Sequence, residues 1–155
     1  MRTLIWNSML TSQMNAIYWN KLACRCAQRE RWIKIFLAVT SSSTVAGWAF
    51  WAQHDSVWKF LSALSAVIAV ILPLLDYSGR VERFNKLSTK CAQLRTGYDQ
   101  LWAQIDDLTP DTIRNMQGQL AAKEIEVADL QTTEPVDRQL LVDCQTEVLQ
   151  SRGLA

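Results

Sequence analysis

The sequence predicts an all-α membrane protein, in which a two-transmembrane helical hairpin joins long cytosolic helices that form a coiled-coil-like stalk. Two long apolar runs lie only four residues apart, a heptad pattern of apolar residues follows the second run, and basic residues flank the pair on both outer sides. A chain of 155 residues is too short to surround two such helices, so a buried hairpin in a soluble protein is the weaker alternative.

The two apolar runs have the length of membrane spans. Residues 33–52 contain one charged residue, Lys34, at their edge, and residues 57–76 contain no ionised side chain between Lys59 and Asp76. Twenty helical residues rise about 30 Å, the thickness of the hydrocarbon core of a bilayer. We therefore predict transmembrane helices over residues 32–53 and 57–76, joined by the polar residues 53–56.

The charge distribution predicts the orientation of the hairpin. The net charge is only +1, but residues 1–95 carry 12 basic against 4 acidic side chains, and the remainder is acidic. The basic residues gather at the inner ends of both spans: Lys21, Arg25, Arg29, Arg31 and Lys34 before the first, and Arg80, Arg83, Lys86, Lys90 and Arg95 after the second. Because positively charged loops stay in the cytosol, we expect a multi-pass protein with both termini cytoplasmic.

The cytosolic part begins with a predicted helix within residues 1–31 and continues after the second span with residues 77–108. We expect the first helix to start at about residue 12, with Ser12 as a candidate cap, and residues 1–11 to extend it or lie at the membrane surface. After the second span, an a/d seam predicts a buried helix face. It consists of Phe84, Leu87, Cys91, Leu94, Tyr98, Leu101 and Ile105, followed by Leu108. This candidate interface packs on the preceding helix of the same chain, on another subunit, or on both.

Two further helices are predicted within residues 109–155, where most of the acidic charge lies. Thr109 is the expected N-cap of the first, followed by Pro110, and this helix should reach about Gln131. Thr133 is the expected cap of the second, which ends before Gly153. The expected apolar residues of the pair are Ile113, Met116, Leu120, Val127, Leu130, Val136, Leu140, Cys144 and Val148. The acidic side chains form a solvated face or a surface that docks a basic partner.

Catalytic and metal-binding patterns are not found in the sequence. The one histidine, His54, falls in the predicted outer turn, and Cys24 and Cys26 point about 200° apart on a helix. Cys91 and Cys144 lie on apolar stripes, where cysteine acts as a small hydrophobe. We therefore expect no enzyme activity, no cofactor and no metal site. Basic residues that flank membrane spans are explained by topology, so we expect no direct binding of nucleic acid.

Five consecutive hydroxyl residues, residues 40–44, occupy the middle of the first predicted span. Hydroxyl groups are tolerated there because they bond to carbonyl groups of their own helix, and small side chains permit close helix contacts. One interpretation is tight packing within the hairpin. The other is a hydroxyl-lined pore in an assembly of hairpins, with Thr40, Ser41, Ser43 and Thr44 as candidate pore-lining residues.

Residues 12–108 resemble the SLATT domain family, two-transmembrane effector modules of bacterial nucleotide-signal conflict systems. The resemblance rests on a basic helix entering the first span, a very short turn, and the spacing of Asp76, Arg80, Phe84 and Leu87, with Tyr98 beyond. It implies a homo-oligomeric defence effector of the bacterial inner membrane, which perturbs or permeabilises the bilayer when a soluble partner or a nucleotide signal activates it. The alternatives are a membrane anchor or scaffold that recruits a soluble partner through its cytosolic helices, and a holin-like phage protein.

Overall fold

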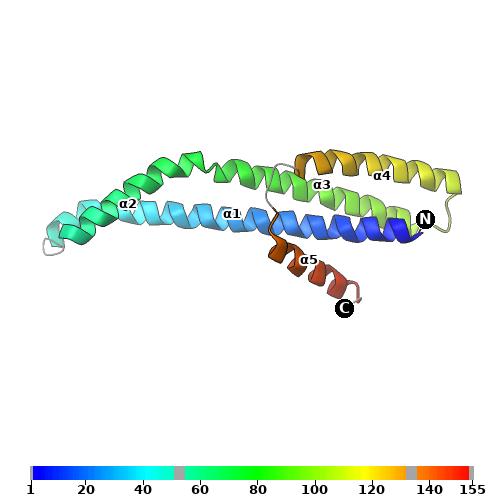
Figure 1. Ribbon diagram of the computed structural model, residues 1–155, viewed down its shortest axis with the longest axis horizontal. Coiled ribbons are helices and arrows are strands. Elements are labelled where there is room, and N and C mark those ends of the chain that lie inside the picture. The colour runs from blue at the N-terminus through cyan, green and yellow to red at the C-terminus, as the bar shows by residue number, and fades with distance from the viewer. Residues whose placement is uncertain (1, 51–54, 132–135, 154–155) are drawn as a thin grey trace. The chain divides into compact units, whose positions relative to one another are not determined.

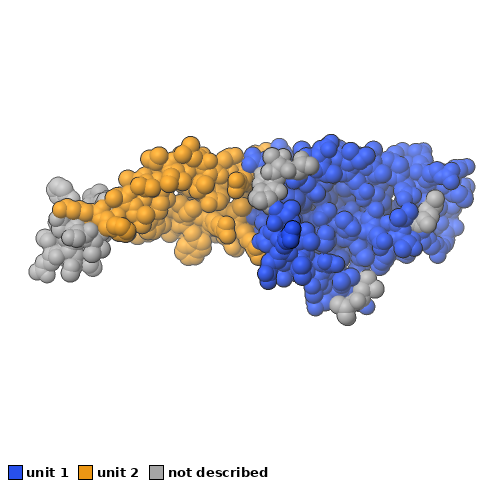
Figure 2. All heavy atoms as spheres, in the orientation of Figure 1, with its two compact units in different colours: residues 1–22, 83–155 blue, residues 23–82 orange. Residues whose placement is uncertain are grey.

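The computed structural model describes residues 2–50, 55–131 and 136–153. It does not describe the side chains of residues 41–58 and 61–62. Most of the described residues are helical and none lies in a β-strand, which confirms the predicted all-α class (Figure 1). The helices are α1 (Arg2–Phe50), α2 (Asp55–Leu74), α3 (Tyr77–Ala103), α4 (Pro110–Gln131) and α5 (Arg138–Ser151). They form two compact units: unit 1 consists of residues 1–22 and 83–155, and unit 2 of residues 23–82 (Figure 2).

Unit 2 contains the later part of α1, all of α2 and the first residues of α3. Helix α1 continues without a break from the predicted cytosolic segment to Phe50, close to the expected end of the first span. The predicted connection at residues 53–56 lies mostly outside the described residues, because the description resumes at Asp55. Helix α2 covers nearly the same residues as the second predicted span.

A defined junction separates α2 from α3. Pro73 lies in the last turn of α2, where its missing N–H removes one helical hydrogen bond, and the helix ends one residue later. Asp76 then adopts a left-handed backbone conformation with φ of 41°, and its Oδ1 accepts a hydrogen bond of 3.2 Å from the N–H of Gly79. A Cβ atom at Gly79 would lie well inside van der Waals distance of the Asp76 carboxylate, so a larger residue there would make this capping side chain shift.

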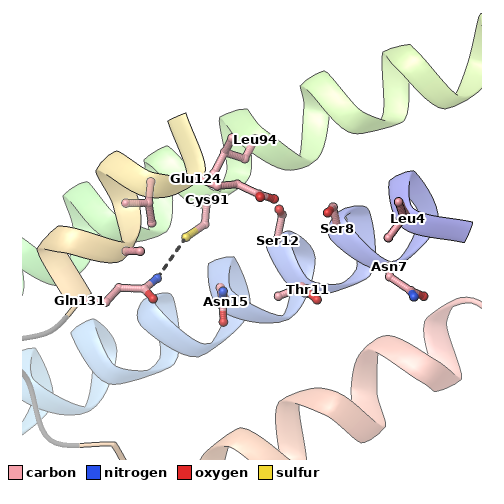
Figure 3. A pocket seen from close by; sticks show the side chains of 12 residues that line it. Leu4, Asn7, Ser8, Thr11, Ser12, Asn15, Cys91, Leu94, Glu124 and Gln131 are labelled. Atoms are coloured by element: carbon pink, nitrogen blue, oxygen red, sulfur yellow. Dashed lines mark hydrogen bonds between the residues drawn. The ribbon is translucent and has the colours of Figure 1, made fainter. Parts of the chain in front are cut away.

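Unit 1 is a bundle of four helical segments around one apolar core. Helices α4 and α5 lie on opposite sides of the pair formed by α1 and α3 (Figures 1 and 3). Trp19 on α1 lies 5.5 Å from Phe84 on α3, and Trp6 lies 5.3 Å from Trp102, measured between ring centroids. The other large buried apolar side chains are Ile5, Met9, Tyr18, Leu87, Leu94, Tyr98, Leu101, Ile113, Leu120, Val127, Leu140 and Val148.

The first helix has the longer of the two predicted forms, in which residues 1–11 extend it. Helix α1 begins at Arg2, and Ser12 lies inside the helix with only 4% of its surface exposed. Ser12 is therefore not an N-cap. The start at Arg2 has a packing cause, because Ile5 and Met9 are fully buried in the core of unit 1 and hold the first turns in place.

The end of α3 also differs from the prediction. The helix stops at Ala103, whereas the heptad pattern extended the expected helix to residue 108. Leu108 donates its N–H to the carbonyl of Gln104 in the following turn, at 3.2 Å, and Ile105 is half-exposed there. The chain must reverse direction within these residues to begin α4, and this reversal ends the helical repeat.

Helix α4 begins as predicted, with Pro110 in its first position and Thr109 before it. The Thr109 Oγ1 accepts the N–H of Thr112 at 3.4 Å, and the helix ends at Gln131, as expected. Met116 is half-buried and Leu130 is 48% exposed, so these two predicted apolar positions lie outside the core.

Helix α5 begins later than predicted. Its N-cap is Asp137, whose side chain accepts the N–H of Leu140 at 3.1 Å. The expected cap, Thr133, lies outside the described residues, and Val136 precedes the helix and is 61% exposed. A tertiary contact explains the choice of cap, because the backbone N–H of Asp137 donates to the Tyr18 hydroxyl at 2.9 Å. Gly153 follows the helix in a left-handed conformation, as predicted.

Candidate functional site

The largest candidate site is an exposed apolar surface on α2. Between Lys59 and Asp76, the described side chains are uncharged and most are exposed. Phe60 is 70% exposed, Val70 68% and Leu74 79%. A soluble monomer rarely exposes so extensive an apolar surface, because each such side chain loses favourable burial.

The length and composition of this segment suit a membrane. Among the described residues, one helical stretch, beginning at Ala63, is long and apolar enough to cross a bilayer, and its apolar part is not covered by other residues of the chain. On α1, Trp32 is 70% exposed beside the ion pair that Lys34 forms with Glu30, at 2.6 Å. An exposed tryptophan next to charged residues is typical of the interface between lipid and water.

Of the four candidate pore-lining residues, the structure describes the side chain of Thr40 alone. Thr40 is 5% exposed, and its hydroxyl donates to the carbonyl oxygens of Phe36 and Leu37, at 2.9 and 3.1 Å. This arrangement fits packing within the hairpin, because the hydroxyl is bonded to its own helix. The side chains of Ser41, Ser43 and Thr44 lie outside the described residues.

The predicted seam on α3 faces the interior of unit 1. Six of its residues are buried against the chain's own helices: Phe84, Leu87, Cys91, Leu94, Tyr98 and Leu101. Ile105 follows the end of α3 and is half-exposed. The same-chain interpretation of the seam is therefore the arrangement seen here, and a second subunit would reach these residues only if another helix moved away.

The contact between α3 and α4 is unusually close at Gly97. A Cβ atom at this position would lie 2.6 Å from the Cδ2 atom of Leu120, well inside van der Waals contact. The absence of a side chain at Gly97 therefore leaves room for the Leu120 side chain of α4 against α3. Lys90 pairs with Glu126 further along the same contact, and this partnership lowers the pKa of Glu126.

Helix α5 is held on α1 and α3 by polar contacts around its buried stripe. The Arg152 guanidinium donates to the Gln13 Oε1 at 2.9 and 3.1 Å and lies 3.4 Å from the Asp99 carboxylate. Lys21 pairs with Glu147 at 2.5 Å, and this hydrogen bond raises the pKa of Lys21. Each exposed pair contributes little by itself, but together they fix the register of α5.

The sequence prediction missed a polar groove in unit 1. Its volume is about 320 Å³, and Figure 3 shows the side chains that line it from α1, α3 and α4. The lining is mostly uncharged: Leu4, Asn7, Ser8, Thr11, Ser12, Asn15, Cys91, Leu94, Glu124, Val127, Ala128 and Gln131. Between helices of a bundle is a common place for a small-molecule site.

Two polar contacts define the inner wall of this groove. The Tyr98 hydroxyl interacts with the side chains of Glu124 and Ser8, and burial, together with the Glu124 charge, raises the pKa of Tyr98 to about 12. The amide of Gln131 lies 4.0 Å from the Cys91 sulfur, and burial raises the pKa of Cys91 to about 11. The Cys91 thiol is therefore protonated at neutral pH and is a poor nucleophile or metal ligand.

A sequence signal for the groove does exist. No residue between Arg2 and Lys21 is charged, yet this stretch contains many small polar residues. Ser8, Ser12 and Asn15 recur at spacings of four and three residues, which places them on one helix face. Such a polar stripe on a helix without charges indicates that the face meets protein rather than bulk water.

The histidine and cysteines of the sequence do not form a cluster within the described parts of the chain. Within them, no group of three or more His, Cys, Asp and Glu side chains could hold a metal ion, and His54 lies outside them. Cys24 is exposed and Cys26 half-exposed, while Cys91 and Cys144 are buried, as expected for small apolar side chains. No protein-family model, curated protein or solved structure matches this chain.

Proposed function

We propose that residues 32–53 and 57–76 cross a bacterial inner membrane as a hairpin, with both termini in the cytoplasm. The observation that carries this proposal is the exposed, uncharged surface of α2. The packing of two distant chain segments into unit 1 is a second, independent support. Residues 1–22 and 83–155 pack into one unit, so they must lie on the same side of any membrane that residues 23–82 cross. An even number of crossings follows.

Within this topology, the leading function is a defence effector that oligomerises and perturbs the membrane when a soluble partner or nucleotide signal activates it. The SLATT-like arrangement of residues 12–108 supports this function. The covered seam on α3 suits the resting form of such a protein, because apolar side chains such as Leu94 and Leu101 are buried within unit 1 and cannot reach other subunits. Activation would then displace a covering helix and free this face for assembly.

Leakage from liposomes tests this function without the activating partner. Leu140 is 2% exposed in the contact of α5 with the rest of unit 1, so Leu140→Asp should detach α5. Val142→Asp on the same helix is the matched control, because Val142 is 58% exposed. We expect Leu140→Asp to release an encapsulated dye while the wild type and Val142→Asp stay tight. If all three proteins insert, α5 is detached in Leu140→Asp, and none of them leaks, the effector function is rejected.

The role of the hydroxyl cluster, residues 40–44, can be tested by comparing dye leakage in the Leu140→Asp background. If the cluster lines a pore, Thr40→Val with Thr44→Val should reduce leakage of Leu140→Asp, since a hydrophobic constriction excludes water. Insertion should persist, because apolar residues favour the bilayer by a few tenths of a kcal/mol each. Unchanged leakage would remove these residues from the pore and favour packing within the hairpin as their role.

A second candidate function is a membrane anchor that recruits a soluble partner through α4 and α5. A specific observation favours it: Ile125 is 65% exposed and Val142 is 58% exposed, on two helices that carry six acidic side chains against three basic ones. Exposed apolar residues among charged ones are typical of weak protein interfaces. An anchor of this kind would show no leakage in any variant, and Ile125→Asp would abolish partner binding without changing insertion.

A further inference from the structure

The groove of unit 1 is polar where the core of a helical bundle is normally apolar. Ser12 is 4% exposed and faces the interior one turn beyond Ser8, with Met9 buried beside them. Burying polar groups lowers stability unless they are hydrogen-bonded to protein, water or ligand. A volume of about 320 Å³ lies within the range of small-molecule sites, so the lining polar atoms have room for a ligand.

The charge of the groove restricts the chemistry of that ligand. Glu124, which is half-buried on α4, is the one carboxylate among the lining residues, and no Lys, Arg or His lines the groove. In Figure 3 the oxygen atoms of Glu124, Ser8 and Ser12 are turned toward one another. The remaining lining polar groups are hydroxyls and amides, which accept hydrogen bonds from a donor ligand as readily as they donate.

A neighbouring cavity provides an internal comparison. It has a volume of about 250 Å³, shares Leu94 and Val127 with the groove, and is lined by Lys90, Lys123 and Glu126. Lys90 is paired with Glu126, so Lys123 gives this cavity a net positive charge that would attract an anion, whereas the groove presents only a carboxylate. The pattern of charges therefore separates the two cavities by the sign of the ligand that each would accept.

We propose that the groove between α1, α3 and α4 binds a small organic cation, a primary alkylammonium. Its ammonium group donates to the Glu124 carboxylate and to the hydroxyls of Ser8 and Ser12, and its chain lies along Leu94 and Val127. Glu124 retains its contact with the Tyr98 hydroxyl, because a carboxylate accepts several hydrogen bonds at once. The proposal is independent of membrane perturbation, since it concerns unit 1 alone.

Binding is tested with putrescine on the purified full chain in detergent micelles, by saturation-transfer NMR and thermal unfolding. The diol of the same carbon chain and succinate are the neutral and anionic comparisons. We expect saturable binding of putrescine, weaker binding of the diol and no binding of succinate. No saturable putrescine binding at about ten millimolar, a range typical of very weak ligands, would overturn the proposal, as would equal binding of the diol.

Variants locate the binding site. Glu124→Gln retains the shape of the side chain but removes its charge, and should weaken putrescine binding by about tenfold or more, the usual value of a charge-assisted hydrogen bond. Glu126→Gln, two residues away and outside the groove, is the matched control and should bind like the wild type. Equal loss in both variants would mean general attraction to the acidic surface and would overturn the assignment.

A third variant keeps the test decisive if Glu124→Gln disturbs folding. Ala128 lines the groove from an exposed position on α4, so Ala128→Phe should fill the groove without replacing a buried side chain. We expect this variant to unfold at the same temperature as the wild type and to lose putrescine binding. Unchanged putrescine binding in folded Ala128→Phe would place the ligand elsewhere and reject the groove as its site.

Discussion

Two glycines on facing helices provide a sensitive test of the bundle geometry. Gly97 lies in α3 against Leu120, where an added Cβ would approach the Leu120 Cδ2 atom to 2.6 Å. Gly118 lies in the exposed part of α4, and an added Cβ there would meet no other atom within 4 Å. The same substitution to alanine therefore has the same local effect on helix propensity and opposite consequences for packing.

The magnitudes follow from these two environments. Replacing a helical glycine by alanine favours the helix by about 0.8–1 kcal/mol, so Gly118→Ala should stabilise unit 1 by about that amount. Gly97→Ala gains the same propensity term, but the new methyl group must displace Leu120, which is 8% exposed. Overpacking of this kind costs about 1–3 kcal/mol, so Gly97→Ala should be neutral or destabilising by up to about 2 kcal/mol.

The buried cysteines provide an assay that reports on unit 1 alone. Cys91 and Cys144 are buried there, and in a Cys24→Ser/Cys26→Ser background they are the remaining thiols. Their rate of modification by a thiol reagent across a denaturant series gives the free energy of opening of each variant. Gly97→Ala should lower this free energy relative to Gly118→Ala by about 1–3 kcal/mol.

A double-mutant cycle makes the comparison specific to one contact. Leu120→Ala lowers stability by itself, but it removes the atom that the new methyl group would meet. Gly97→Ala should therefore stabilise in the Leu120→Ala background, with a coupling of about 1–2 kcal/mol. Equal stabilisation by both glycine substitutions, without coupling to Leu120, would refute the close approach of α3 and α4 at this point.

Three further predictions concern the core, the topology and the pH dependence. Leu94→Asp places an unpaired charge at a position that is 4% exposed, and it should destabilise unit 1 by about 3–5 kcal/mol. Val142→Asp, at an exposed position, should cost less than about 0.5 kcal/mol. Thiol exposure in denaturant measures both variants, and a stably folded Leu94→Asp would contradict the buried seam. In intact cells, Asp55→Cys should react with an impermeant thiol reagent, whereas the exposed Cys24 should react only after permeabilisation. The reverse pattern would overturn the proposed orientation with both termini in the cytoplasm. Burial raises the pKa of Cys91 from its ordinary value of 9.0 to about 11, so the folded state holds this proton more tightly than the unfolded state. The stability that this difference contributes is complete below pH 9 and is lost as the pH rises through 11. Between neutral and alkaline pH, the denaturation midpoint should therefore fall less steeply in Cys91→Ala than in the wild type, and equal slopes would contradict the shift.

The parts of the fold that the sequence predicted depend on local periodicity. The heptad spacing placed six residues from Phe84 to Leu101 on one face of a helix, and all six lie buried. The capping residues Thr109 and Pro110 predicted the start of α4, because their effect is confined to the first turn. The apolar length of residues 57–76 predicted α2 in the same way.

The parts that the sequence did not predict depend on contacts between distant segments. The N-cap of α5 is Asp137 because its N–H meets the hydroxyl of Tyr18, 119 residues away. The start of α1 at Arg2 depends on the burial of Ile5, and the polar groove on the packing of Ser12 near Glu124. Propensity and spacing do not report which helix faces meet, so these features required the three-dimensional arrangement.

The interleaved composition of unit 1 has a consequence for the order of synthesis. Residues 1–22 leave the ribosome before their partners, which begin at residue 83, beyond the 60 residues of unit 2. At about 5–20 residues per second, roughly 3–12 s pass before any of these partners exists. During this interval Ile5, Met9 and Trp19 have no partners to pack against, so their apolar surface stays exposed in the nascent chain. A ribosome that stalls after α2 would release a product whose first helix lacks its partners in unit 1, with Ile5 and Met9 left unburied.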